Sequence, residues 1–178
     1  VMNELDALAN IDFQTREVKP EHRTLNILRI GTSGAIQPEI PLGAFVFSHI
    51  SVGCDGLMNW YADRDKISLP DIEEAFKKHL DWSPLLCAPY TVPADSELVE
   101  RIAKDDMVRG VTISCGGFFG PQGRRLRVPL AFPKQNELVE SFEYEGQRIT
   151  NFEMESSALA GLSALMGHKA VTVCLVIA

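Results

Sequence analysis

The C-terminal part of the chain constrains the fold most, because a helix pattern there runs directly into an apolar strand pattern. The apolar residues of segment 153–166 recur at helical spacing: Ala158, Leu159, Leu162, Leu165 and Met166. Gly167 predicts the end of this helix, since glycine readily adopts the left-handed backbone conformation that closes helices. Residues 170–178 are continuously apolar and predict a buried strand.

The same alternation of strand and helix patterns extends upstream. Strands are expected at 26–30, 42–52, 88–92, 108–115 and 148–152. Helices are expected at 70–82, 95–104 and 136–144. The intervening segments predict a turn at 31–34 and loops at 53–65 and 116–133. This alternation predicts an α/β fold with a mostly parallel or mixed central sheet, and no linker divides residues 1–178, so we expect one domain.

Composition narrows the possible partners. The net charge is -7, with 24 acidic against 17 basic residues, so no basic surface is available to bind the backbone of a nucleic acid. No apolar stretch approaches the ~18 residues that a membrane span needs. The four cysteines form no CxxC motif and no cluster with histidine, which favours reduced, mostly buried thiols in a cytoplasmic protein over a disulfide or metal site.

Both ends of the sequence lack the usual boundary signals. Residues 1–8 have the pattern of an amphipathic helix without a start signal. Nothing follows the strand predicted for 170–178, although a central strand normally leads into a loop or a helix. We therefore expect a piece of a longer chain, truncated at both ends.

Three short segments carry candidate chemistry, and the first is Arg29-Ile30-Gly31-Thr32-Ser33-Gly34. A glycine-flanked turn after a strand lets backbone N–H groups approach an anion without interference from Cβ atoms. Hydroxyls at Thr32 and Ser33 and the guanidinium of Arg29 add further donors, and the guanidinium fork suits a phosphate. A tight turn with an exposed arginine is the alternative interpretation.

The second segment is Phe118-Phe119-Gly120-Pro121-Gln122-Gly123-Arg124. The amide of Gln122 offers both a donor and an acceptor, which matches one edge of a uracil ring. Arg124 can donate to O4 of the same ring, and Phe118 can cover a base or a sugar. A flexible surface loop with solvated arginines at 124, 125 and 127 is the alternative.

The third segment is Phe152-Glu153-Met154-Glu155-Ser156-Ser157. A carboxylate at Glu155 can accept hydrogen bonds from both cis hydroxyls of a ribose, and Met154 offers an apolar surface for the sugar ring. Helix capping by Glu153 and Glu155, which the helix dipole favours, is the alternative. Together the three segments suggest a nucleoside site in which phosphate, base and ribose are each bound by a different segment.

These three segments, in this order, resemble the nucleoside phosphorylase family and, within it, the uridine phosphorylase branch. The resemblance implies a Rossmann-like α/β/α fold with a mixed, partly barrel-like sheet. It also implies reversible phosphorolysis of uridine to uracil and ribose 1-phosphate, with inorganic phosphate as co-substrate and no cofactor or metal. The expected partners are a nucleoside, phosphate and further copies of the chain, in a dimer or a hexamer built of dimers.

The resemblance also assigns roles to single residues. Arg29 and Thr32 hold phosphate, and Gly31 gives it room. Phe118 packs on the nucleoside, and Gln122 and Arg124 read uracil. Met154 and Glu155 hold the ribose, and Glu153 lines the same pocket. Arg29, Thr32, Arg124 and Glu155 are the candidate catalytic residues.

The resemblance further implies parts that this chain does not contain: a glycine-rich phosphate turn, another arginine, a histidine from a neighbouring subunit and a base-site residue beyond Ala178. The chain alone is therefore expected to be inactive, although its parent is active. Ser33 stands where a second threonine is common in the branch. A purine nucleoside phosphorylase, a nucleosidase and a non-catalytic nucleoside-binding module remain alternative functions.

Overall fold

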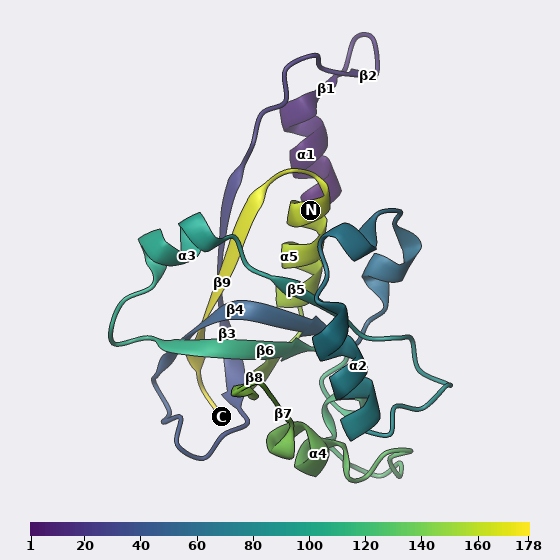
Figure 1. Cartoon of the computed structure of the whole chain (residues 1–178), viewed down its shortest axis with the longest axis vertical. Helices are drawn as coiled ribbons and strands as arrows, with labels where there is room; N and C mark the ends of the chain where they lie inside the picture. Colours follow the sequence, from purple (N-terminus) through teal and green to yellow (C-terminus); the bar gives the residue numbers. More distant parts are fainter.

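The structure is a computed structural model that describes all 178 residues, and it contains five α-helices and nine strands (Figure 1). The helices are α1 Met2–Asn10, α2 Pro70–His79, α3 Ser96–Ile102, α4 Gln135–Ser141 and α5 Ser156–Leu165. The strands are β1 Ile11–Asp12, β2 Glu17–Val18, β3 Asn26–Ala35, β4 Phe45–Gly53, β5 Tyr90–Pro93, β6 Val108–Ser114, β7 Glu143–Tyr144, β8 Gln147–Glu153 and β9 Lys169–Val176. No helix is both long and apolar enough to span a membrane.

The central sheet is mixed and closes on itself. Its strand order is β3-β9-β4-β6-β8-β7, and β5 pairs with β4. The β3–β9, β4–β6 and β6–β8 pairs are parallel, whereas the β4–β9 pair is antiparallel. Because β3 also pairs with β8 through Gly34 and Ala35, strands β3, β9, β4, β6 and β8 form a closed ring. The mixed, partly barrel-like sheet expected from the sequence is confirmed.

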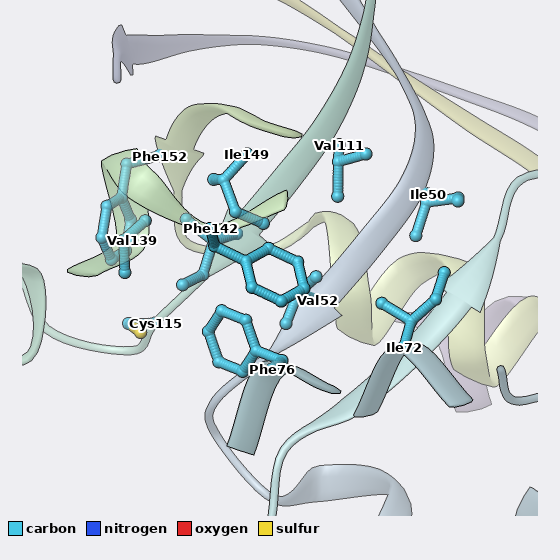
Figure 2. Packing of buried hydrophobic residues seen from close by; sticks show 11 residues of the cluster. Ile50, Val52, Ile72, Phe76, Val111, Cys115, Val139, Phe142, Ile149 and Phe152 are labelled. Atoms are coloured by element: carbon cyan, nitrogen blue, oxygen red, sulfur yellow. The ribbon is translucent and has the colours of Figure 1, made fainter. Parts of the chain in front are cut away.

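Helices cover the sheet on two sides. Helices α2 and α4 pack on β4, β6 and β8, and α1 and α5 pack near β5 and β9 (Figure 1). Figure 2 shows the larger core, in which the two phenylalanine rings of Phe76 and Phe142 meet edge to face at 5.2 Å between centroids. The members of this core are Ile50, Val52, Ile72, Phe76, Val111, Ile113, Cys115, Val139, Phe142, Ile149 and Phe152. This layering is the α/β/α arrangement that the resemblance implies.

The glycine-rich segment 31–34 is not a turn, as the sequence predicted, but the second half of strand β3. Gly31 pairs with Cys174 and Ser33 with Val176 of β9, and Gly34 pairs with Phe152 of β8, so the two partner strands hold the backbone extended through both glycines. The parallel partner strand outweighs the local preference of glycine for turns. The residues of this segment therefore alternate between the two faces of a strand.

Two helix boundaries also differ from the prediction. Glu153 is the last residue of β8, and α5 begins three residues later at Ser156, because Glu153 pairs with Ser114 in the sheet. The helix expected at 136–144 ends at Ser141, and Tyr144 belongs to the β7–β8 hairpin. Gly146, at φ 76°, forms the turn of that hairpin and does not close the helix.

Candidate functional site

The three candidate segments converge on one cavity of about 330 Å³. Strands β3 and β8, the C-terminal residues after β9 and the loop between β6 and α4 supply its walls. The lining residues are Arg29, Thr32, Ser33, Gly34, Phe118, Gln122, Arg124, Phe152, Glu153, Met154, Glu155, Ile177 and Ala178. All predicted site residues except Gly31 belong to this set. The volume is within the range of small-molecule sites.

Arg29 is the centre of the charged part of the cavity. Its Nη1 atom lies 3.0 Å from a carboxylate oxygen of Glu153 and 3.4 Å from Sγ of Cys174, and its Nη2 atom pairs with Glu155. Partial burial alone would lower the pKa of Arg29, but the charge of Glu153 and the contacts with Cys174 and Glu155 outweigh it, so this pKa is raised. Arg29 is therefore a fixed positive charge at the cavity wall.

Gly31 lies beneath the guanidinium of Arg29. A Cβ atom on Gly31 would lie 2.7 Å from Nη1 and 2.8 Å from Cζ of Arg29, closer than any real contact. The glycine is therefore needed for the position of Arg29. The space that the sequence assigned to a ligand at Gly31 is filled by this side chain.

Glu153 is buried and its carboxylate is fully engaged by the protein. It accepts from the backbone N–H groups of Glu155 at 3.0 Å and of Ser156 at 3.0 and 3.1 Å, which caps the start of α5. It also accepts from the hydroxyls of Ser156, at 2.8 Å, and of Ser114. The capping interpretation thus holds for Glu153, and its second role is to hold Arg29.

Glu155 and Met154 differ from Glu153 because they face open space. The side chain of Glu155 is 56% exposed and has Arg29 as its one ion-pair partner. Met154 is 38% exposed on the same rim. A ligand can therefore reach the carboxylate of Glu155 and the thioether of Met154 directly, whereas it cannot replace the partners of Glu153 without uncapping α5.

The loop residues Phe118, Gln122 and Arg124 form one compact unit. The guanidinium of Arg124 stacks 3.9 Å above the ring of Phe118 and donates to its carbonyl at 2.8 Å. Arg124 also donates to Oε1 of Gln122, and Nε2 of Gln122 donates to the carbonyl of Cys115 at 3.4 Å. Gln122 is buried, so this segment is not a solvated surface loop, although Arg125 and Arg127 are exposed.

The two hydroxyls of the first segment lie on opposite faces of β3. Strand alternation places Ser33 on the face of Arg29 and Gly31, where it is 5% exposed. Thr32 lies on the exposed face, although it still lines the rim of the cavity. Ser33 accepts a hydrogen bond from Nδ2 of Asn151 at 3.0 Å.

Sequence reasoning missed the residues that support this site from behind, above all Ser114 and Asn151. Both are buried, and both are on strands that run parallel to each other, where Thr112 pairs with Asn151 and Ser114 with Glu153. The available signal was a polar residue inside an otherwise apolar strand pattern. Such residues need buried hydrogen-bond partners, which the sequence alone does not identify.

One further cluster of titratable side chains, Asp6, His22 and His168, lies outside the cavity. Nδ1 of His168 accepts the backbone N–H of Leu25 at 3.2 Å, which leaves Nε2 as a donor to Asp6 at 3.1 Å. A metal at Nε2 would require a proton on Nδ1, facing the Leu25 donor. This donor set does not fit a metal ion, and the cluster ties α1 to the start of β9.

All four cysteines are free. Cys115 and Cys174 are buried, Cys54 is half-buried and Cys87 is exposed, in line with the expectation of reduced, mostly buried thiols. The pKa of the Cys54 thiol is raised by its hydrogen bond with Cys115 and by burial.

Comparison with known proteins identifies the family. The family model of the phosphorylase superfamily matches residues 8–178, and the chain therefore belongs to the phosphorylase superfamily. A uridine phosphorylase of Thermococcus kodakarensis is 27% identical over 157 residues, a match that covers 85% of this chain and 47% of the relative. The chain thus spans about half the length of this curated relative.

Two solved structures support the fold. A nucleoside phosphorylase of Trypanosoma brucei, described as showing uridine phosphorylase activity, aligns with a TM-score of 0.78 at 22% identity over 98% of this chain and 65% of its own. Isoform 2 of uridine phosphorylase from Schistosoma mansoni, in complex with citrate, aligns with a TM-score of 0.53 at 23% identity. That second alignment covers 87% of this chain and 49% of the neighbour. The nucleoside phosphorylase fold expected from the sequence is confirmed.

Proposed function

We propose that the protein to which this chain belongs catalyses the reversible phosphorolysis of a pyrimidine nucleoside, with uridine as the preferred substrate. One observation carries the proposal: Arg29, the Gln122–Arg124 pair and Glu155 line a single cavity in a chain of the phosphorylase superfamily. Arg29 matches the phosphate, the Gln122–Arg124 pair matches the base, and Glu155 matches the ribose. The proposed role is in nucleoside salvage in the cytoplasm.

The residue types fit the charges that develop in this reaction. Cleavage of the glycosidic bond leaves positive charge on the ribose and negative charge on the departing base. Phosphate held by Arg29 and Thr32 meets the first, and the guanidinium of Arg124 stabilises the second. Glu155 orients the sugar through its hydroxyls, so that phosphate is placed under the anomeric carbon. The nucleophile is phosphate itself, and no cofactor or metal takes part.

Base recognition rests on the hydrogen-bond donors and acceptors of Gln122 and Arg124 that have no partner within the protein. Oε1 of Gln122 accepts from Arg124 through one of its two lone pairs, and Nε2 uses one of its two hydrogens. The free lone pair matches the N3–H group of uracil, and the free N–H matches O2. Arg124 still has N–H groups for O4.

The sharing of Arg29 between two carboxylates predicts low activity for the 178 residues alone. Arg29 is paired with two carboxylates, so a phosphate dianion must displace Glu155 from Nη2 before it binds. One arginine shared in this way is a weak anion site. We therefore propose that the 178 residues alone bind phosphate weakly and turn over little or no uridine.

Exposed apolar side chains near the site support association of several copies. Ile30 is 77% and Trp60 87% exposed, and Leu28, Phe45 and Ile177 are also exposed. Phe47 and Ile50 are buried in the core and do not contribute to this exposed surface. We propose a homo-oligomer, and light scattering after size exclusion measures its mass; a monomer at every concentration would refute it.

The proposed activity is tested by a phosphorolysis assay on the full-length parent protein and on this chain. Uridine and inosine are compared with and without phosphate, and uracil release is followed. Phosphate-dependent turnover of uridine by the parent supports the proposal, whereas inosine turnover or phosphate-independent cleavage would point to the purine or nucleosidase alternatives. Binding of uridine without turnover by the parent would leave a nucleoside-binding module.

The matched variant is Gln122→Ala in the parent protein. We expect it to reduce kcat/KM for uridine by about tenfold to a hundredfold, because two hydrogen bonds to the base are lost. Arg125→Ala serves as the control, since Arg125 is exposed and does not line the cavity. Unchanged uridine turnover in Gln122→Ala would refute the assignment of the base site.

A further inference from the structure

Two rows of polar side chains cross strands β6, β8 and β3 on the same face of the sheet. In the first row, Ser114 on β6 donates to Glu153 on β8, which holds Arg29 on β3. In the second row, Thr112 on β6 donates to Asn151 on β8 at 2.8 Å, and Asn151 donates to Ser33 on β3 at 3.0 Å. Both rows end at the cavity, and the first one positions a residue of the candidate site.

The second row is completely buried until it reaches the cavity. Thr112 and Asn151 are 0% exposed. Ser48, on the neighbouring strand β4, contacts the hydroxyl of Thr112 and is 1% exposed. The hydroxyl of Thr150 lies 3.0 Å from both Oδ1 of Asn151 and the carbonyl oxygen of Val111, and its single proton can go to only one of them. A buried amide costs stability unless its hydrogen bonds are made. Those of Asn151 are made to the hydroxyls of Thr112 and Ser33.

The hydrogen bonds give this row a direction. Thr112 has one hydroxyl proton, which goes to Oδ1 of Asn151, so Ser48 donates to Thr112 across their 2.6 Å contact. With its oxygen held by the hydroxyl of Thr112, the amide of Asn151 turns its nitrogen to Ser33. Ser33 therefore accepts from the protein, and no protein acceptor takes its own proton. That proton remains for a ligand in the cavity.

We propose that Asn151 is a positioning residue that fixes the hydroxyl of Ser33 as a hydrogen-bond donor to the bound phosphate. The assignment rests on the proposed function. Ser33 shares its face of β3 with Arg29, and the guanidinium of Arg29 lies over Gly31, the one residue of that face between them. An anion that binds Arg29 above Gly31 would therefore lie at the same-face position next to Ser33. A donor there strengthens an anion site whose single arginine is shared with two carboxylates.

The experiment measures phosphate binding and does not depend on turnover. The full 178-residue chain is labelled with ¹⁵N and titrated with inorganic phosphate, and the amide signals of residues 29–34 report the Kd. Ser33→Ala is expected to raise this Kd by about tenfold, the effect of one hydrogen bond to a charged group. Ser33→Thr keeps the hydroxyl and is expected to stay within about threefold of the wild type.

Asn151→Asp tests the direction of the row, since aspartate has the same shape but cannot donate from its carboxylate. The hydroxyl of Ser33 then turns its proton to Asp and no longer donates to phosphate, so the Kd rises about tenfold. A negative charge alone would also weaken phosphate binding. The double variant with Ser33→Ala separates the two effects, because the aspartate should add less than about twofold when Ser33 has no hydroxyl.

Each result decides the inference. If Asn151→Asp weakens phosphate binding equally with and without the Ser33 hydroxyl, or if Ser33→Ala leaves the Kd unchanged, Asn151 does not act through Ser33. If Asn151→Asp does not fold by circular dichroism, Thr112→Val replaces it, with an expected rise of about threefold, and no rise refutes the row. A wild type without shifts at 29–34 overturns the inference and the phosphate site. Phosphate binding that needs Ser33, in a parent without uridine turnover, overturns only the proposed function.

Discussion

Glu153→Gln is expected to lower the thermal stability of the chain far more than Glu155→Gln, although both residues pair with Arg29. The side chain of Glu153 is 2% exposed and that of Glu155 is 56% exposed. Glutamine is nearly isosteric with glutamate, so the comparison isolates charge and hydrogen bonding. Two positions in one short segment thus separate a support role from a ligand-facing role.

The magnitude follows from the partners of Glu153. Its two oxygens accept from Arg29, from the backbone of Glu155 and Ser156 and from two serine hydroxyls. A glutamine has one acceptor oxygen, so its NH₂ group must face either Arg29 or the serine side. Removal of one partner of a buried pair costs about 3–5 kcal/mol. Because the side chain of Arg29 is 23% exposed, we expect about 2–4 kcal/mol.

Thermal unfolding followed by circular dichroism measures this difference. For a domain of this size, 1 kcal/mol corresponds to about 2–4 °C in Tm, so Glu153→Gln should lower Tm by roughly 5–15 °C. Glu155→Gln loses a solvent-exposed ion pair worth about 0–1 kcal/mol and should lower Tm by no more than about 4 °C. Equal shifts in the two variants would refute the view that Glu153 supports the site from within the fold.

Three other substitutions or conditions test separate parts of the structure. Gly31→Ala pushes the guanidinium of Arg29 aside and should weaken phosphate binding about tenfold by titration. It should also cost about 1–3 kcal/mol of stability, because Nη1 of Arg29 moves away from the buried carboxylate of Glu153. Gly53→Ala places a Cβ atom 2.3 Å from Cζ of the fully buried Tyr90 and should lower stability by about 1–3 kcal/mol or more in urea unfolding. Burial lowers the pKa of His49, so the unfolded chain binds a proton that the folded chain does not, and stability should fall as pH drops below about 6.5.

Each of these predictions has a control. Gly116→Ala, in the loop after β6, meets no atom within 4 Å and should leave stability unchanged. An equal loss in Gly53→Ala and Gly116→Ala would show that the loss of a glycine, and not the contact with Tyr90, is responsible. His49→Gln removes the titrating group and should flatten the pH dependence between about pH 7.5 and 5.5. Unchanged stability in Gly31→Ala would mean that Arg29 keeps its pair with Glu153.

Most of the fold was predictable because each long element carries a strong periodic signal. The stripe of Leu159, Leu162 and Leu165 gave the last helix, and the apolar run after Gly167 gave the last strand. The prediction was wrong where a distant partner decides the local conformation. Segment 31–34 is extended because β9 pairs with it, and that pairing joins residues more than 140 positions apart.

The site was predictable in its residues but not in its internal contacts. The motifs identified Arg29, Gln122, Arg124 and Glu155, and the structure brings their side chains to one cavity. The sequence did not reveal that Glu153 faces inward, because that depends on where β8 ends and α5 begins. Nor did it reveal Asn151, whose importance appears only when β3 closes the sheet against β8.

The charged groups that face the cavity are paired within the protein: Arg29 with Glu155, and Arg124 with Gln122. Such pairs keep the charged groups satisfied, but a ligand gains only the difference between its own contacts and those it replaces. Glu153 and Asn151 lie behind these groups: Glu153 also holds the start of α5, and Asn151 supports Ser33 from within the sheet. The proposed chemistry therefore depends on a division between exchangeable pairs at the rim and fixed rows behind them, and substitutions in the fixed rows should change stability and phosphate binding together.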